Sequence, residues 1–444
     1  MTTHPRITIL GGGAAGLAVG YYSSKNKIPF TIHEAGERIG GNCITYREGD
    51  FRFDSGAHRF HDKDDEITEE FRQLLGDDFR KIKVPSYIYH NGKLVFFPLA
   101  PLNMFKNLGP FTFFKVAVEI LASRIAPEKN KGSFRDFAVN TYGKTLAHSF
   151  LLNYSEKLWG RDCSELSPQI AGKRMKGLDL RTFVVEAVMG QRAKTEHVDG
   201  SFYYPDLGIG AITDKLAEYC GEENIRRRSE ITKVLCGDNK IKHIEINGSE
   251  ILEVDKLVST LPLYNFLRMM DPQPEEGILE IAKKLRYRNV VLVAFFLERE
   301  SLTDAGTIYF PDSDTPITRM YEPRNRSRQM SPAGRTSLVV EMPCAPDELL
   351  WHSSDEKLVE TAYSNLADIG ILKPGDVIST SVKRLSHAYP VLETGFEAKV
   401  QEVNDYLKRF ENLRLSGRSG KFEYAWIHGM MRSGREIVDE HILA

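Results

Sequence analysis

Strong net charge, paired cysteines and long apolar runs are all missing from this 444-residue sequence. The formal net charge is −2 at pH 7, so no bulk field favours nucleic acid or an anionic membrane as a partner. The five cysteines are scattered, form no C-x-x-C pair and make no His/Cys cluster at metal spacing. We therefore expect no metal site and a reduced, cytoplasmic environment. The absence of a charged-then-apolar leader supports the same compartment.

The most membrane-like stretch, residues 110–126, is too short to span a bilayer and is interrupted by Lys115, Glu119 and Arg124. We interpret it as an amphipathic helix packed on its own protein, with a surface anchor as the alternative. We expect no transmembrane segment. The length suffices for two or three domains, and the sequence leaves the oligomeric state open.

What the sequence does contain is a dinucleotide-binding signature near its start. Residues 7–10 form an apolar run typical of a buried parallel strand, and glycines in G-x-G-x-x-G spacing follow at the start of a helix. Such glycines permit the turn, the approach of a pyrophosphate and close helix–strand packing. A second β-type run ends in Glu34, 18 residues after the last glycine, where an acid can bind a ribose. The residues predicted to surround the diphosphate are Gly11, Gly13, Ala14, Ala15 and Gly16.

A second glycine turn follows, Arg38-Ile-Gly-Gly-Asn-Cys-Ile-Thr45. With this turn the sequence resembles the FAD proteins of the amine oxidase, protoporphyrinogen oxidase and UDP-galactopyranose mutase superfamily, in which the turn runs beneath the flavin diphosphate. The resemblance implies FAD as the cofactor, with NAD as the weaker option. Further cofactor-binding residues that it implies are Arg38, Gly41, Asn42, Ile231, Arg418 and Met430.

Several other segments are similar to the mutase branch of this superfamily. Gly56-Ala57-His58 matches a loop that places a histidine beside the flavin, so Gly56 and His58 are also assigned to the cofactor. The resemblance implies a catalytic set of His58, Arg174, Arg319 and Tyr389, in which the two arginines and the tyrosine hold a substrate diphosphate. The substrate-binding residues that it implies are Trp159, Arg174, Tyr309, Arg319, Arg326, Tyr389 and Tyr424.

The residues alone leave alternatives open at some of these positions. Trp159 is equally compatible with a core aromatic, and Arg174 with a surface charge. Arg326 stands near a position where many mutases carry a second tyrosine, so the phosphate contact there is either replaced by arginine or lost.

The predicted fold class is α/β. The resemblance implies a Rossmann-like FAD-binding domain of the GR2 type, assembled from residues 1–100, 203–262 and 386–444. A helical substrate or cap domain is expected at residues 101–202, and an antiparallel-sheet substrate domain at residues 263–385.

No Ser-His-Asp set, metal cluster or obvious paired-carboxylate site is apparent, so a cofactor must carry the difficult chemistry. The resemblance implies a mutase that interconverts the pyranose and furanose forms of a UDP- or dTDP-sugar through a flavin N5–sugar adduct. This reaction needs reduced FAD, with NADPH or NADH as candidate reductants. The alternative is an FAD-dependent oxidase or dehydrogenase of the amine oxidase or protoporphyrinogen oxidase type; a flavoprotein that only binds a ligand is a third reading. In each case a small molecule is the expected partner.

Overall fold

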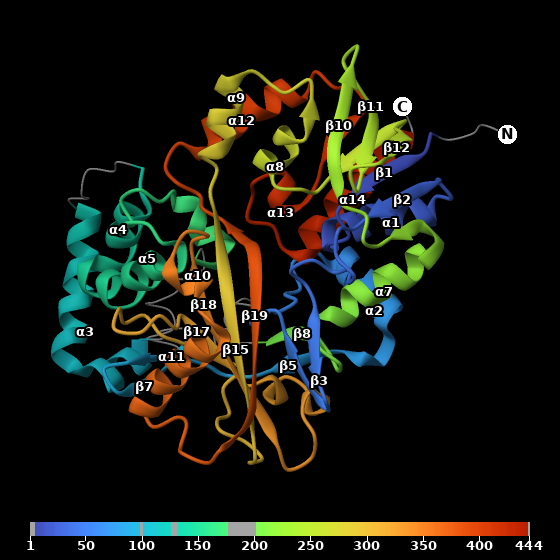
Figure 1. Ribbon diagram of the computed structural model, residues 1–444. Coiled ribbons are helices and arrows are strands. Elements are labelled where there is room, and N and C mark those ends of the chain that lie inside the picture. The colour runs from blue at the N-terminus through green and yellow to red at the C-terminus, as the bar shows by residue number, and fades with distance from the viewer. Residues whose placement is uncertain (1–4, 98–100, 126–131, 176–200, 443–444) are drawn as a thin grey trace.

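The computed structural model describes residues 5–97, 101–125, 132–175 and 201–442. Long strands run down the middle of the molecule, a group of helices lies on one side, and a dinucleotide-type sheet lies on the other (Figure 1). This mixed α/β architecture confirms the predicted fold class. None of the described helices is long and apolar enough to cross a membrane.

The amino-terminal strand lies at the centre of a five-stranded parallel sheet. The order is β20 (Leu413–Leu415), β13 (Lys256–Ser259), β1 (Ile7–Leu10), β2 (Phe30–His33) and β9 (Ile225–Arg226). Every residue of β1 is buried, as expected for a parallel strand covered on both faces. Strands from three distant chain segments, residues 7–33, 225–259 and 413–415, thus meet in one sheet.

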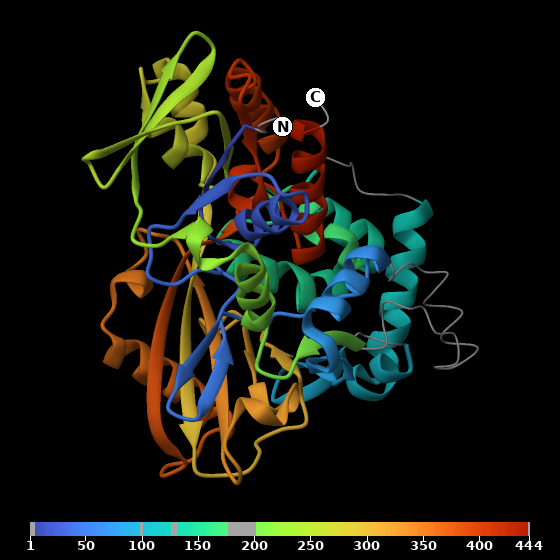
Figure 2. The ribbon, with the colours of Figure 1, turned by 90° about the vertical axis from the view of Figure 1, so that its right-hand side faces the viewer.

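Helices from three parts of the chain cover this sheet. Helix α1 (Ala14–Lys25) packs against α7 (Gly210–Cys220) and α14 (Ile427–Ile442), and Figure 2 shows α14 beside α1. Close packing requires Gly434, because a Cβ there would lie 2.9 Å from the Ala18 backbone. Helix α2 (Asp65–Leu75) begins at Asp64, whose side chain accepts a hydrogen bond from the Ile67 amide. The carboxyl-terminal helix therefore closes the amino-terminal domain.

A smaller sheet extends this domain. Its strand order is β12 (Glu250–Glu253), β11 (Lys240–Ile246), β10 (Ile231–Gly237) and β14 (Met270–Asp271). Helices α8 (Leu263–Arg268), α9 (Glu276–Lys283) and α12 (Phe396–Leu407) contribute to the apolar core beneath it. Two antiparallel pairs complete the region: the hairpin of β3 (Thr45–Glu48) with β4 (Phe51–Asp54), and the long-range pair of β5 (Phe79–Lys83) with β8 (Ser201–Pro205).

The central sheet has seven strands. The order is β19 (Val377–Pro390), β15 (Tyr287–Leu297), β18 (Thr336–Cys344), β17 (Arg319–Tyr321), β16 (Thr307–Tyr309), β6 (Ser86–His90) and β7 (Lys93–Phe97). All eleven residues of β15 are buried, because alternate side chains enter two different cores. One of these cores includes α11 (Asp355–Asp368), which follows the short helix α10 (Leu349–His352).

The composition of this sheet differs from the predicted segment boundaries. The β6–β7 hairpin, expected within the FAD-binding segment, joins the sheet through a parallel pairing of β6 with β16, so the sheet is mixed rather than antiparallel. Strand β19 also runs past residue 385 to Pro390. The hairpin has a tight two-residue turn, in which Asn91 and Gly92 both have positive φ.

Helices between residues 101 and 175 form the third part. They are α3 (Pro101–Ile125), α4 (Phe134–Leu146), a π-helical turn (Ala147–Leu152), α5 (Asn153–Trp159) and a 3-10 segment (Pro168–Met175). Ser133 and Asp136 form a capping box at the start of α4. Gly109 has φ 81° immediately before Pro110, so α3 is kinked there.

Only one face of α3 packs as predicted. Val116 and Ile120 are buried in a core with Tyr142, Leu146 and Phe150. The opposite face carries large apolar side chains that remain exposed. The segment is therefore not the conventional amphipathic helix expected from its sequence, because apolar residues occupy both faces.

Candidate active site

The first glycine turn creates a backbone surface that can receive a diphosphate. Helix α1 starts at Gly13 without a side-chain cap and has no acidic residue in its first turn. Its initial N–H groups and the positive end of the helix dipole are therefore directed at this position. A Cβ on Gly16 would lie 2.0 Å from the Gly11 carbonyl oxygen, so only glycine permits this strand–helix contact. The structure brings Gly11, Gly13, Ala14, Ala15 and Gly16 together here.

Glu34 lies beside this turn at the end of β2. Its two carboxylate oxygens accept hydrogen bonds from the Gly12 and Gly36 amides, each 2.8 Å long. Ile231 starts β10 and is buried; its segment is linked to Glu34 because the Ser229 amide donates to the Glu34 carbonyl. Glu34 and Ile231 thus lie on neighbouring segments beside the glycine turn, and their contacts with a nucleoside stay a prediction.

The second glycine turn packs directly on the first. The Gly40 amide donates to the Gly12 carbonyl over 2.8 Å, and a Cβ on Gly41 would lie 3.0 Å from Gly13 Cα. Arg38 donates to the Thr45 carbonyl, and the Asn42 side chain reaches the His387 carbonyl at 3.4 Å. The two glycine turns thus form a continuous backbone cradle. This cradle fits the diphosphate and ribityl chain of FAD.

The loop Gly56–His58 follows β4 and lies against the central sheet. The Ala57 amide donates to Glu341 over 2.6 Å, and the His58 ring lies 3.3 Å from the Ser55 hydroxyl. Burial lowers the pKa of His58 to about 3, and the positive charges of Arg319, Arg418 and Arg326 act in the same direction. His58 is therefore neutral over the physiological range and can serve as a hydrogen-bonding group, not as a cation.

Acid is expected to destabilise the protein through His58. The folded state holds this ring neutral with a pKa of about 3, whereas the unfolded chain takes up its proton near pH 6.5. The stabilisation is fully present above the unfolded pKa and is lost as pH falls towards the folded pKa. Between about pH 7 and pH 5 we expect a loss of about 2 kcal/mol in unfolding free energy through this ring. Chemical denaturation at both pH values checks this: His58→Gln should reduce the difference, and an equal difference in the variant would contradict the assignment.

Arg319, Glu341 and Tyr389 form the charged centre of the candidate site. Arg319 on β17 and Glu341 on β18 are direct cross-strand partners and form an ion pair, with the carboxylate 1% exposed and the guanidinium 14% exposed. Arg319 Nη2 donates to the Tyr389 hydroxyl over 2.7 Å. Burial opposes the charged form of Arg319, but Glu341 raises the arginine pKa well above its usual value, so the cation persists.

Glu341 is not among the site residues predicted from the sequence. The signal was present, since a lone acid in the apolar run Ser-Leu-Val-Val-Glu-Met (337–342) rarely becomes buried without a partner. Its partner could not be identified from the sequence, because the pairing of β17 with β18 spans 22 residues.

Aromatic rings line one side of this centre. Trp159, Tyr389 and Tyr424 lie with ring centroids 5.9 to 6.4 Å apart. Arg418 lies over both tyrosine rings and donates to the Ala388 and Ala425 carbonyls. Its buried Nε has no hydrogen-bond partner, which leaves one donor available to a bound group. Tyr309 lies near Tyr154, with centroids 5.8 Å apart. The structure thus gathers Trp159, Tyr309, Arg319, Tyr389, Arg418 and Tyr424 around His58 and Glu341.

Arg326 occupies a different place from the one predicted. Its side chain is completely buried, 4.0 Å from the Asp54 carboxylate, and donates to the His58 and Gly306 carbonyls. Burial raises the pKa of Asp54, opposed by hydrogen bonds from Tyr204 and by the Arg326 charge. We therefore assign Arg326 to positioning of the Gly56–His58 loop, because two of its guanidinium nitrogens donate to backbone carbonyls there.

The predicted contacts of two further residues stay predictions. Arg174 lies in the 3-10 segment Pro168–Met175, and its side chain lies outside the described residues. Met430 on α14 packs with Ile427 against the apolar core around α1. Neither observation supports the predicted contact.

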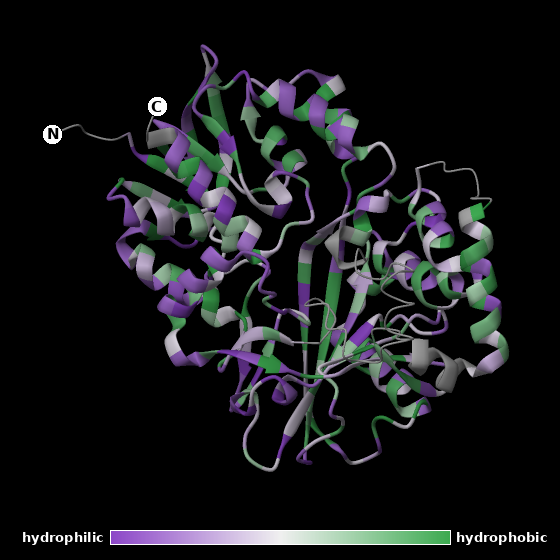
Figure 3. Ribbon diagram, turned by 180° about the vertical axis from the view of Figure 1, so that it is seen from behind, coloured by the Kyte–Doolittle hydropathy of each residue, from purple (hydrophilic) through white to green (hydrophobic). Residues whose placement is uncertain are grey.

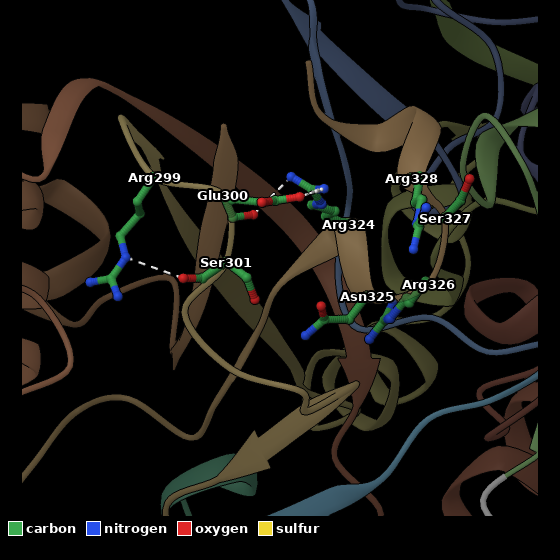
Figure 4. Close-up of a pocket in the computed structure, with 8 residues that line it drawn as sticks. All are labelled: Arg299, Glu300, Ser301, Arg324, Asn325, Arg326, Ser327 and Arg328. Carbon is green, nitrogen blue, oxygen red and sulfur yellow. Dashed lines mark hydrogen bonds and ion pairs between the residues drawn. The ribbon is translucent and has the colours of Figure 1, made fainter. Parts of the chain in front are cut away.

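A cavity of about 700 Å³ lies elsewhere, around residues 299–301 and 324–328. Figure 4 shows that arginines dominate its lining. Arg324 donates to Glu300, and Arg299 pairs with Asp376; the guanidinium of Arg326 is buried against carbonyl groups. The charges of Arg299 and Arg324 are thus paired with protein carboxylates, whereas the buried Nε of Arg326 has no hydrogen-bond partner. We do not assign the activity to this cavity, because none of its lining residues belongs to the Arg319–Tyr389 centre.

Comparisons with known proteins agree with this geometry. A family model described as flavin containing amine oxidoreductase matches residues 14–440. Coproporphyrinogen III oxidase of Staphylococcus aureus is 20% identical over 474 aligned residues, which cover 98% of each chain. Protoporphyrinogen oxidase 1 of Arabidopsis thaliana is 26% identical over 322 residues, which cover 66% of this chain and 59% of that protein.

Two solved structures share the fold over nearly the whole chain. A reduced UDP-galactopyranose mutase superposes with a TM-score of 0.84 at 20% identity, covering 99% of this chain and 95% of the mutase. A putative protoporphyrinogen oxidase from Exiguobacterium superposes with a TM-score of 0.79 at 18% identity, covering 100% and 99%. These likenesses establish the fold.

Proposed function

The chain belongs to the flavin-containing amine oxidoreductase family, and from this premise we propose that it is a flavoenzyme that interconverts ring forms of a nucleotide-linked sugar. FAD is the proposed cofactor, held by the two glycine turns, Glu34 and Arg418. The substrate is a UDP- or dTDP-sugar, which lies against the Arg319–Tyr389 pair.

The observation that carries this proposal is the arrangement of donors around Arg319. Its Nε is bonded to Glu341 and its Nη2 to Tyr389, while Nη1 makes no hydrogen bond to the described residues. Because Glu341 is almost inaccessible, its charge holds the guanidinium in place without facing the aromatic rings. A guanidinium and a phenol side by side suit the oxygens of a diphosphate, and such bonds contribute about 1.5–3 kcal/mol each.

The surrounding residues suggest how the substrate is oriented. The rings and hydroxyl groups of Tyr389 and Tyr424, which pack against the buried Trp159 ring, suit a sugar nucleotide. Arg319 and Tyr389 would hold the departing diphosphate and keep it near the sugar for recapture. Neutral His58 would fix the adjoining loop. A reduced flavin, when bound, supplies the nucleophile for this chemistry, and no net oxidation occurs.

The redox dependence of nucleotide binding tests the proposal. We expect UDP or dTDP to bind more tightly after anaerobic reduction of the holoenzyme by dithionite or NADPH, as followed by flavin fluorescence. Reduced enzyme should convert a UDP- or dTDP-sugar to its other ring form without consuming electrons. Tyr389→Phe removes one donor and should lower turnover about tenfold or more. The matched variant Tyr219→Phe, at an exposed position on α7, should behave as the parent.

An oxidase is the second candidate, because the curated relatives with full-length coverage are named coproporphyrinogen III oxidases. This function predicts that a reduced tetrapyrrole bleaches oxidised flavin and that turnover consumes oxygen or another acceptor. Oxygen uptake with such a substrate, together with absence of ring interconversion by the reduced enzyme, would reject the mutase. Ring interconversion without oxygen uptake would reject the oxidase.

A further inference from the structure

An apolar surface on α3 is not used by the fold. We define the outer face of α3 as Phe111, Phe114, Lys115, Val118, Leu121 and Ile125. The five apolar residues are 84%, 64%, 64%, 54% and 86% exposed, in that order. Their spacing of three and four residues places them along one side of the helix. Figures 1 and 3 show α3 at the outer edge of the molecule.

Such exposure is unusual for a helix in a globular protein, where the face opposite the core is normally polar. The inner face already buries Val116 and Ile120, so the outer face is not needed for the packing of the helix. A contiguous row of large apolar side chains in water costs free energy and typically marks an interaction surface.

The charges on α3 favour one kind of partner. Lys115 is the charged residue of the outer face; its side chain is 57% exposed, and its ammonium lies 3.9 Å from a Glu119 carboxylate oxygen. Glu119, the one acid in the sequence of α3, turns inward and accepts hydrogen bonds from the Thr145 amide and hydroxyl, both 2.7 Å long. The sequence of α3 contains three basic residues, Lys106, Lys115 and Arg124, against this acid. The helix therefore combines exposed apolar side chains with positive charge.

We propose that the outer face of α3 docks the protein on the surface of a bilayer that contains anionic lipid. The helix lies parallel to the surface, with Phe111 and Phe114 entering the acyl boundary and Lys115 reaching back to phosphate groups. The kink at Gly109–Pro110 separates this segment from the preceding turns of α3. Pairing with a second copy is disfavoured, because it would bury the Lys115 ammonium among apolar side chains.

Vesicle flotation of the FAD-loaded full-length protein at physiological ionic strength tests this surface. We expect binding to vesicles of phosphatidylcholine and phosphatidylglycerol in equal amounts, and weaker binding to phosphatidylcholine alone. Phe111→Asp/Phe114→Asp should reduce binding to the mixed vesicles roughly tenfold or more. Lys115→Glu should reduce it less, and mainly on the anionic vesicles.

Leu349→Asp is the matched control, because Leu349 is 83% exposed on α10, away from α3; this variant should bind as the parent does. Bound FAD and the circular dichroism spectrum show whether each variant is folded. The proposal would be overturned if the parent protein did not float with the mixed vesicles. So would a folded double variant that binds like the parent, or a concentration-dependent dimer that the double variant disrupts without any vesicle binding.

Discussion

Replacing Arg319 by alanine is expected to destabilise the protein by about 3–5 kcal/mol and to abolish productive substrate binding. The stability loss follows from Glu341, which is 1% exposed and would lose its ion-pair partner in the sheet interior. The remaining amide of Ala57 donates one hydrogen bond to this carboxylate, which is too little to replace a full positive charge. Chemical denaturation and nucleotide titration of the same preparation measure the two effects.

The double variant Arg319→Met/Glu341→Gln separates structure from function. Removing both charges eliminates the uncompensated buried carboxylate, so we expect most of the lost unfolding free energy to return. Nucleotide affinity should stay low by about 10- to 100-fold, because the guanidinium donors are still missing. A single Arg319→Ala variant as stable as the parent would show that Glu341 does not depend on this partner. Recovery of nucleotide binding in the double variant would contradict the placement of Arg319 at the substrate.

Local features of the fold could be predicted from sequence because short-range rules determine them. The glycine turn after β1, the Asn91–Gly92 hairpin and the capping box of α4 each depend on a few neighbouring residues. Pairing between distant strands could not be predicted in this way. The parallel register of β6 with β16 joins residues more than 200 positions apart, and neither strand carries a local signal for its partner.

The same distinction applies to the candidate site. Arg319 and Tyr389 were predicted as substrate residues, and the structure brings them within hydrogen-bond distance of each other. Arg326 has the same side chain as Arg319, yet it is buried against the His58 and Gly306 carbonyls. Sequence identifies the type of side chain, but only the fold decides whether a guanidinium faces a substrate or supports a loop.

For α3 the sequence left two alternatives open, packing on its own protein and a surface anchor. An apolar helix that packs on its own protein and one that also presents an apolar surface have the same composition. What distinguishes them is which side chains meet Tyr142, Leu146 and Phe150 of the neighbouring helices, and this is a tertiary property.

Gly16→Ala is expected to remove FAD from the protein. The added Cβ would lie 2.0 Å from the Gly11 carbonyl oxygen and 3.3 Å from an Ile9 side-chain carbon, far inside van der Waals contact. Helix α1 must therefore shift away from β1, which moves its N-terminal amides away from the diphosphate cradle. We expect a cost of about 3 kcal/mol, or a loss of about 100-fold in FAD affinity.

Gly277→Ala provides the matched control for this substitution. Gly277 also lies in a helix, α9, and a Cβ there would meet nothing within 4 Å. This variant should retain FAD and gain about 0.5–1 kcal/mol, because alanine favours helix more than glycine does. The flavin-to-protein absorbance ratio after gel filtration compares the two variants. Equal flavin content in both would show that the strand–helix contact at Gly16 does not control the cofactor site, because the two substitutions add the same methyl group and differ only in what it meets.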